Sequence, residues 1–253
     1  MSVFKLPKRL CNDINGMFSK FWWGKQQSEG GIQWRKWDKM GMHKGRGGLG
    51  FRDLESFNLA LLAKQGWRLT RNSESLAAVV FKKKYFRHTS FMEAKLGSQP
   101  SLIWRSVWLA RGLLQEGLRW KVGDGSKIKI WGDKWLSTPT SYAVQSPVSG
   151  LQGEARVEEL IVKHKREWDE VKIRSIFSDE EAEQILSIPL SRGQVQDKII
   201  WGPSKKGVFT VNSAYYLQLE RIRNIKGGSS EEEKEDKRWR SIWELEVPRV
   251  VKS

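Results

Sequence analysis

Apolar residues recur with the spacing of an α-helix along the first half of the chain. Pro7 suits a first helical turn, and apolar residues follow it at i, i+4, i+7, i+8 and i+11. These residues are Leu10, Ile14, Met17, Phe18 and Phe21. A longer helix is predicted after a candidate cap at Asp53, with a buried stripe. That stripe consists of Leu54, Phe57, Leu61, Leu62 and Leu69. Shorter helices are predicted around residues 76–80 and after Pro100, where Trp104 and Trp108 share a face.

The period changes from helical to alternating after Leu118. Ile128 and Ile130 alternate with lysines beyond a Gly-Asp-Gly turn, which predicts a β-hairpin over about residues 118–135. A second hairpin is predicted at about 198–211, with its turn in the glycine-bounded segment 202–207. Between them, Ser178 stands three residues before Glu181, as in a helix capping box. The predicted fold class is therefore α+β, mainly helical, with two small β-hairpins.

Composition divides the chain into four predicted segments. They are a basic helical region at 1–117, a Trp-rich hairpin and loop at 118–150, a helical connector with the second hairpin at 151–208, and a truncated helical segment at 209–253. The last segment contains glycines, serines and acids at 226–236, a composition typical of a flexible linker. An ordered pattern restarts after it at Trp239, Ile242, Trp243 and Leu245.

Positive charge is concentrated in the first part of the chain. The whole sequence has 45 basic and 29 acidic residues, a net charge of +16. Residues 1–150 hold 26 basic and 10 acidic side chains, whereas residues 151–253 hold 19 of each. A positive field of this size attracts polyanions, so RNA or DNA is the expected partner. A surface that is basic only for solubility remains the alternative.

The sequence lacks the residues that disulfides, cysteine-built zinc sites and membrane-spanning segments require. Cys11 is the single cysteine, so no internal disulfide and no cysteine-built zinc site is expected, and no cofactor is predicted. No apolar run reaches the roughly 18–20 residues that span a bilayer, so no membrane partner is expected. The basic, apolar N-terminal segment also fits a mitochondrial targeting helix, an alternative that the sequence leaves open.

Acidic residues do not form a recognisable catalytic pattern. Nucleotide polymerisation needs carboxylates that hold two metal ions, and no Asp-Asp pair occurs. The pairs Asp169-Glu170 and Asp179-Glu180 stand where helices are expected to begin, which favours capping over metal binding.

The segment Gly45–Gly50 fits G-x-G-x-x-G, but no apolar strand precedes it, so a tight loop with positive φ angles is expected instead.

Basic clusters are the strongest binding candidates. Their alternative is a solvated charged face without a ligand. The candidate nucleic-acid-binding residues are Lys44, Arg46, Lys82, Lys83, Lys84, Arg87, Lys127, Lys129 and Lys134. The chain also has 14 tryptophans, which can stack on bases, but the pairs Trp22-Trp23 and Trp104-Trp108 lie on apolar stripes and are expected to pack in cores.

Several sequence words together resemble one family. The words are Phe21-Trp22-Trp23-Gly24, Ile32-Gln33-Trp34, Gly47-Gly48-Leu49-Gly50-Phe51-Arg52-Asp53-Leu54, Phe57-Asn58-Leu59-Ala60-Leu61-Leu62-Ala63-Lys64-Gln65, Trp104-Arg105-Ser106, Trp120 to Trp135, Asp197 to Trp201 and Trp239 to Pro248. In this order they resemble plant LINE-type (non-LTR) retrotransposon reverse transcriptases, in the region after the polymerase core that runs into the start of a zinc-binding domain. The chain departs from that family at Gly41-Met42-His43-Lys44, where the family usually has Cys-x-Pro-Lys, and at its end.

The resemblance implies a non-catalytic part of a reverse transcriptase that contacts the backbone of RNA or an RNA/DNA hybrid. It further implies a polymerase domain as a partner and favours the nucleus. Two alternatives stay open: a degenerate retroelement fragment without a biochemical role, and residual polymerase or nuclease activity. The sequence does not indicate an oligomeric state.

Overall fold

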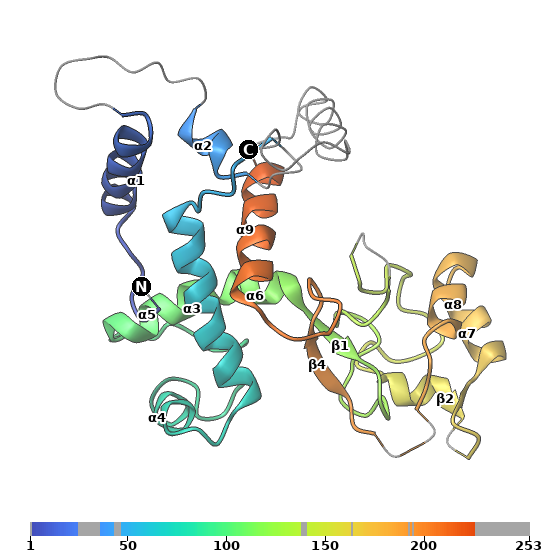
Figure 1. Ribbon diagram of the computed structural model, residues 1–253. Helices are drawn as coiled ribbons and strands as arrows, with labels where there is room; N and C mark the ends of the chain where they lie inside the picture. Colours follow the sequence, from blue (N-terminus) through green and yellow to red (C-terminus); the bar gives the residue numbers. More distant parts are fainter. Residues whose placement is uncertain are drawn as a thin grey trace. The chain divides into compact units, whose positions relative to one another are not determined.

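The computed structural model describes residues 2–24, 36–42, 47–137, 141–162, 164–191, 193 and 195–225. Helices and short strands make the fold α+β and mainly helical, as predicted (Figure 1). The chain forms two compact units, which we call unit 1 (Met1–Gln115 with Thr210–Ser253) and unit 2 (Glu116–Phe209). The predicted segments 118–150 and 151–208 thus both lie essentially within unit 2. Among the described helices, none has the length and apolar character that crossing a membrane requires.

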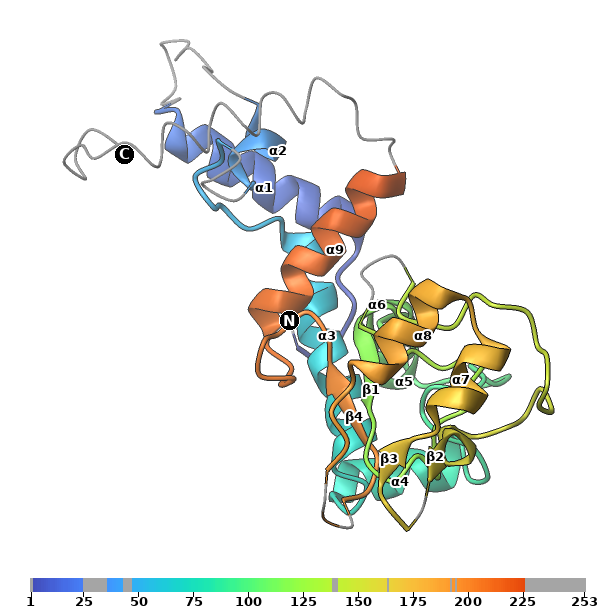
Figure 2. The ribbon, with the colours of Figure 1, turned by 90° about the vertical axis from the view of Figure 1, so that its right-hand side faces the viewer.

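Helix α3 is the centre of unit 1. Helix α9 lies alongside it in both views, and α5, α1 and α4 also contact it (Figures 1 and 2). The helices are α1 (Lys8–Trp22), α2 (Trp37–Met40), α3 (Leu54–Arg71), α4 (Leu76–Tyr85), α5 (Leu102–Leu109), α6 (Arg111–Gly117) and α9 (Val211–Ile225). The sequence predicted α1, α3, α4 and α5 close to their observed places.

The buried face of α3 differs from the predicted stripe. Leu62 and Leu69 are buried, but the other predicted leucines and Phe57 are only partly covered. The rest of the buried face consists of Asn58 and the small residues Ser56, Ala60, Ala63 and Gly66. A methyl group added at Gly66 would lie 2.7 Å from a side-chain carbon of Leu114. The small residues therefore let neighbouring elements approach α3 closely.

The predicted apolar face of α1 is largely exposed. Leu10 is 44% exposed, Phe18 48%, Met17 59% and Phe21 87%. Only Cys11 is buried in this helix, and burial raises the pKa of its thiol. The segment before α1 is fixed instead by Asn58 of α3, whose side chain accepts a hydrogen bond from Leu6 N and donates one to Phe4 O, each at 2.9 Å.

In five of the described helices, a polar side chain caps the N-terminus by accepting a hydrogen bond from a backbone N–H of the first turn. They are Asp53 for α3, Ser75 for α4, Ser101 for α5, Asp169 for α7 and Ser178 for α8. Ser178 was predicted to form a capping box with Glu181. The Ser178 half is present, but the Glu181 carboxylate accepts hydrogen bonds from Gln145 N and Ser146 N instead.

Unit 2 is built around a hydrophobic core that joins its two halves. The core includes Ile128, Ile130, Trp135, Val157, Leu160, Ile173 and Ile185, each no more than 4% exposed. The elements around it are β1 (Leu118–Lys121), a 3-10 helix (Val157–Leu160), β2 (Ile161–Val162), β3 (Glu167–Trp168), α7 (Glu170–Ile176), α8 (Asp179–Leu186) and β4 (Lys198–Trp201). A boundary at residue 150 would therefore divide this core.

Neither predicted hairpin forms as expected. Strand β1 pairs with β4 in an antiparallel ladder, although about 80 residues separate them (Figure 1). Residues 127–130 alternate between exposed lysine and buried isoleucine, but their partner is a bridge from Lys129 to Arg156. The alternation of polar and apolar residues determines which side chains face a core, but it does not determine which strand is the hydrogen-bonding partner. The two-stranded sheet of β2 and β3 was not predicted.

Candidate nucleic-acid interface

The cluster of Lys82, Lys83, Lys84 and Arg87 lies at the C-terminal end of α4. All four side chains are exposed, and the three lysines form the last turn of the helix. Cations are favoured at a helix C-terminus because the macrodipole is negative there. Successive helical residues point about 100° apart, so three lysines in a row present charge over a broad arc. This arrangement suits contact with a phosphate backbone.

An aromatic cluster anchors the end of α4. The Tyr85 ring stacks on Trp104 with centroids 4.6 Å apart, and the Phe86 ring stacks on it at 5.6 Å. Trp104 is fully buried, and its Nε1 donates to Leu96 O at 3.0 Å. The Lys84 ammonium lies 5.3 Å from the Tyr85 ring centroid. The lysines therefore extend from a rigid base.

A second basic surface lies on α3. Lys64, Arg68 and Arg71 are exposed and recur at i, i+4 and i+7, which places them on one face of the helix. Trp67 lies among them, partly exposed, with the Arg71 guanidinium 5.9 Å from its ring centroid. The sequence analysis did not predict this surface, because its cations are not consecutive in the chain. Its helical spacing was the available signal.

Lys127, Lys129 and Lys134 each have a different partner in the structure. Lys129 forms an ion pair with Glu154 at 2.6 Å. Lys134 is partly buried, its Nζ lies 3.3 Å from Glu116 O, and burial lowers the pKa of its ammonium. Lys127 is exposed, and its Nζ donates to the side chain of Gln196 at 3.2 Å. Of these three lysines, Lys127 is the most accessible to a ligand.

Two other predicted residues, Lys44 and Arg46, lie outside the described residues. The loop around them was expected to need positive φ angles, and Gly47 and Gly50 have them at 74° and 77°. The prediction of a tight loop is confirmed at these two glycines. The placement of the two cations stays a prediction.

The ladder between β1 and β4 brings together two lysines that sequence reasoning did not select. Lys121 and Lys198 are direct partners in it, and both are exposed. No local signal could have paired them, because the pairing depends on strand partners that are distant in the sequence.

The acidic residues of the described chain do not assemble a metal site. No group of three or more His, Cys, Asp or Glu side chains in this part could hold a metal ion. Asp169 caps α7, and Glu170 pairs with Arg174 at 3.0 Å, so the capping interpretation of this pair is confirmed.

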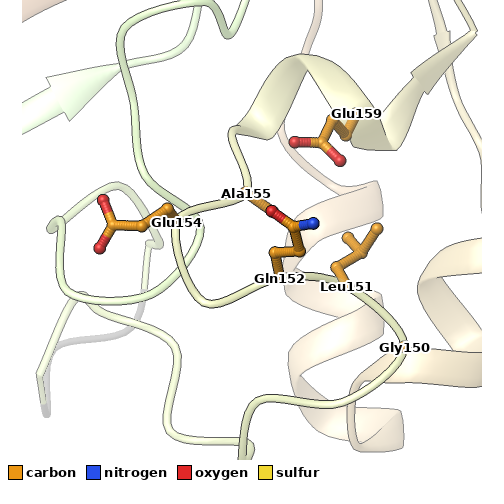
Figure 3. Close-up of a pocket in the computed structure, with 6 residues that line it drawn as sticks. All are labelled: Gly150, Leu151, Gln152, Glu154, Ala155 and Glu159. Carbon is orange, nitrogen blue, oxygen red and sulfur yellow. The ribbon is translucent and has the colours of Figure 1, made fainter.

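A hollow at residues 150–159 has two carboxylates on different sides (Figure 3). Glu154 pairs with Lys129, and Glu159 accepts from Arg156 N.

Most tryptophans among the described residues serve packing, as predicted. Besides Trp104, Trp108 donates its Nε1 to Ala94 O at 2.8 Å, and Trp201 is fully buried. Trp22 is an exception to the expected burial, because it is 49% exposed while its ring meets the edge of Phe51 at 4.7 Å.

Net charge differs sharply between the two units. Unit 1 contains 30 basic and 15 acidic residues, whereas unit 2 contains 15 basic and 14 acidic residues. Nearly all the excess positive charge therefore belongs to the unit that includes the α3 and α4 surfaces.

Comparisons with known proteins place the chain among plant proteins. An Arabidopsis thaliana protein described as an "uncharacterized mitochondrial protein" is 41% identical over 141 residues, which are 55% of the chain and 92% of that protein. The chain belongs to this protein's family. No protein-family model matches the chain, and no solved structure does.

A second Arabidopsis relative matches the whole chain. It is described as a "putative ribonuclease H protein" and is 27% identical over 260 residues, which cover 100% of the chain but only 40% of that protein. The chain thus spans less than half of this relative. Both matches are plant proteins, as the resemblance predicted, and they are consistent with a retroelement origin.

Proposed function

We propose that the chain is a non-catalytic part of a retrotransposon reverse transcriptase polyprotein that binds the backbone of RNA or an RNA/DNA hybrid. Lysine and arginine side chains neutralise phosphates and thereby position template or primer for a catalytic domain elsewhere in the polyprotein. The sequence words that resemble LINE-type reverse transcriptases support the polyprotein, as does the match to less than half of a longer plant protein.

The concentration of charge on unit 1 is the observation that supports backbone binding most. This unit has twice as many basic as acidic residues, and exposed cations follow one face of α3 and the last turn of α4. Such surfaces release condensed counterions when they meet phosphates, which gives affinity without reading bases. Ordinary solubility does not require cations to be gathered in this way.

A non-catalytic role agrees with the acidic residues of the described chain. Polymerases and RNase H enzymes need clustered carboxylates to hold two metal ions. The second relative's description concerns the whole of that protein, of which this chain matches 40%. We assign the catalytic work to other parts of such a protein.

The test is a salt titration of the full chain with fluorescently labelled single-stranded RNA, single-stranded DNA and an RNA/DNA hybrid of equal length. The full chain is needed because a cut at residue 150 would divide the core of unit 2. The expected log-log slope of affinity against salt is about −0.7 for every neutralised phosphate of a single strand. Binding should vary little with base sequence. Absent or salt-independent binding would contradict the proposal and favour a degenerate fragment without a role.

The compartment is a separate question. The LINE resemblance favours the nucleus, whereas one relative is described as mitochondrial, and the basic N-terminal segment also fits a targeting helix. A fluorescent tag at the C-terminus of the full chain, imaged in plant cells, distinguishes the two compartments.

A further inference from the structure

The β1–β4 ladder contains a pairing of like charges. Lys121 and Lys198 stand directly opposite each other at the end of the ladder. Side chains of directly opposed residues share a face of the sheet, with Cβ atoms about 4.5–5.5 Å apart. Two ammonium groups in this position repel each other and destabilise the ladder unless an anion lies between them.

No described residue forms an ion pair with Lys121 or Lys198. Both side chains are exposed. The carboxylate adjacent in sequence belongs to Asp197, which is only 6% exposed. Its oxygens accept hydrogen bonds from the backbone N–H groups of Gly123, Gly125 and Lys127. That carboxylate is therefore engaged inside the turn.

A third ammonium lies at the same end of the ladder. The Nζ atom of Lys127 lies 3.2 Å from the side-chain oxygen of Gln196, two residues before Lys198. The other nearby carboxylate, Asp124, accepts hydrogen bonds from the N–H and hydroxyl of Ser126. Lys127 thus lies beside the segment that leads into Lys198, and the Asp197 hydrogen bonds hold the two segments together.

We infer that Lys121 and Lys198, with Lys127 beside them, form a phosphate-binding site on unit 2 for the backbone of single-stranded nucleic acid. The inference rests on the proposed function and adds a contact outside the strongly basic unit 1. Unit 2 has a net charge of only +1, so a merely solvated basic surface does not explain why like charges are opposed here. A bound phosphodiester accepts hydrogen bonds from both ammonium groups and removes their repulsion.

The sharpest variant is Lys198→Glu in the full chain, because binding and stability should respond in opposite directions. An opposite charge across from Lys121 replaces repulsion with attraction, so the melting temperature of the free protein should rise by roughly 1–4 °C. The same change should weaken binding to labelled single-stranded RNA. A lysine that served only the fold would lower the melting temperature when replaced.

Further variants test whether RNA binding depends on the positive charge of the two lysines. Lys121→Gln with Lys198→Gln should reduce the salt slope by about 0.7, the value for the one phosphate that the two lysines share. Lys121→Arg with Lys198→Arg should keep the wild-type slope. The matched control is Lys205→Gln with Lys206→Gln, two exposed lysines in the turn after β4; it removes the same charge and should leave the slope unchanged.

The outcomes separate this inference from the proposed function. A Lys198→Glu protein that is more stable but binds RNA like the wild type would show tolerated repulsion without a site. Equal binding of poly-L-glutamate and RNA by the wild type would overturn the assignment to phosphate. If RNA binding depends on Lys82, Lys83 and Lys84 but not on Lys121 and Lys198, only the inference fails. If the full chain binds no nucleic acid, both fail.

Discussion

Asp197 and Gly123 lie 74 residues apart in the sequence, yet the Asp197 Oδ1 atom accepts a 2.7 Å hydrogen bond from Gly123 N. The same oxygen accepts from Gly125 N at 2.9 Å, and Oδ2 accepts from Lys127 N at 2.8 Å. A methyl group at position 123 would lie 2.3 Å from Val195 O, so only glycine allows this approach. One buried carboxylate thereby fixes the turn after β1 to the start of β4.

Replacing Asp197 with alanine should destabilise the fold by about 3 kcal/mol. The change leaves three backbone donors without their acceptor, two of them buried, and an unsatisfied buried donor costs about 1–3 kcal/mol. Urea unfolding measures the effect. Asp179→Ala, which removes an exposed carboxylate in the first turn of α8, is the control and should lose less than about 1 kcal/mol. Equal losses of unfolding free energy in the two variants would show that the three hydrogen bonds to Asp197 do not stabilise the fold.

Two helical glycines should respond in opposite directions to substitution by alanine. At Gly66 the new methyl group meets Leu114 at 2.7 Å and Phe91 at 2.9 Å, so overpacking should cost about 1–3 kcal/mol. At Gly16 nothing lies within 4 Å, so alanine should stabilise α1 by up to about 1 kcal/mol. Thermal unfolding of both variants checks the pair. If Gly66→Ala stabilised the protein, Leu114 and Phe91 would not pack closely against α3 at this position.

Asn58 should be replaceable only at a substantial loss of stability. Its side-chain amide makes two hydrogen bonds to the backbone of residues 4–6, which an apolar residue cannot make. Asn58→Ala should cost about 2 kcal/mol because a backbone donor and an acceptor lose their partner in a partly buried place. Asn72→Ala, at an exposed position after α3, is the matched control. Proteolysis near the N-terminus should increase in the first variant alone, and no increase would speak against the role of this amide.

The sequence predicted what depends on local rules and missed what depends on distant partners. The helix starts at Asp53 and Ser178 were predicted from capping chemistry, which acts within three residues. The burial of Ile128 and Ile130 follows from alternation. Their pairing does not, because a strand's partner is chosen by packing across the whole unit. The same limit hid the Lys121–Lys198 pair, whereas the α3 surface was readable from its helical spacing.

The full chain should not incorporate nucleotides or cleave nucleic acid when Mg²⁺ or Mn²⁺ is added. This expectation follows from the missing Asp-Asp pair in the sequence and from the dispersed acids of the described residues. Primer extension and RNase H assays on rigorously purified protein check it, with an active reverse transcriptase as the positive control. Turnover that co-purifies with the chain and needs the metal would support the residual-enzyme alternative.

The most direct test of backbone binding by unit 1 is to replace Lys82, Lys83 and Lys84 together with glutamine. Glutamine has nearly the same helix propensity as lysine, so α4 should be retained while three charges are lost. The salt slope for single-stranded RNA should fall by about 0.7 for every phosphate contact removed, and affinity should weaken similarly for all sequences. The matched variant replaces Lys165, Lys205 and Lys206, three exposed lysines of unit 2, and should change the slope little. An unchanged slope in the first variant, or an equal fall in both, would contradict the account.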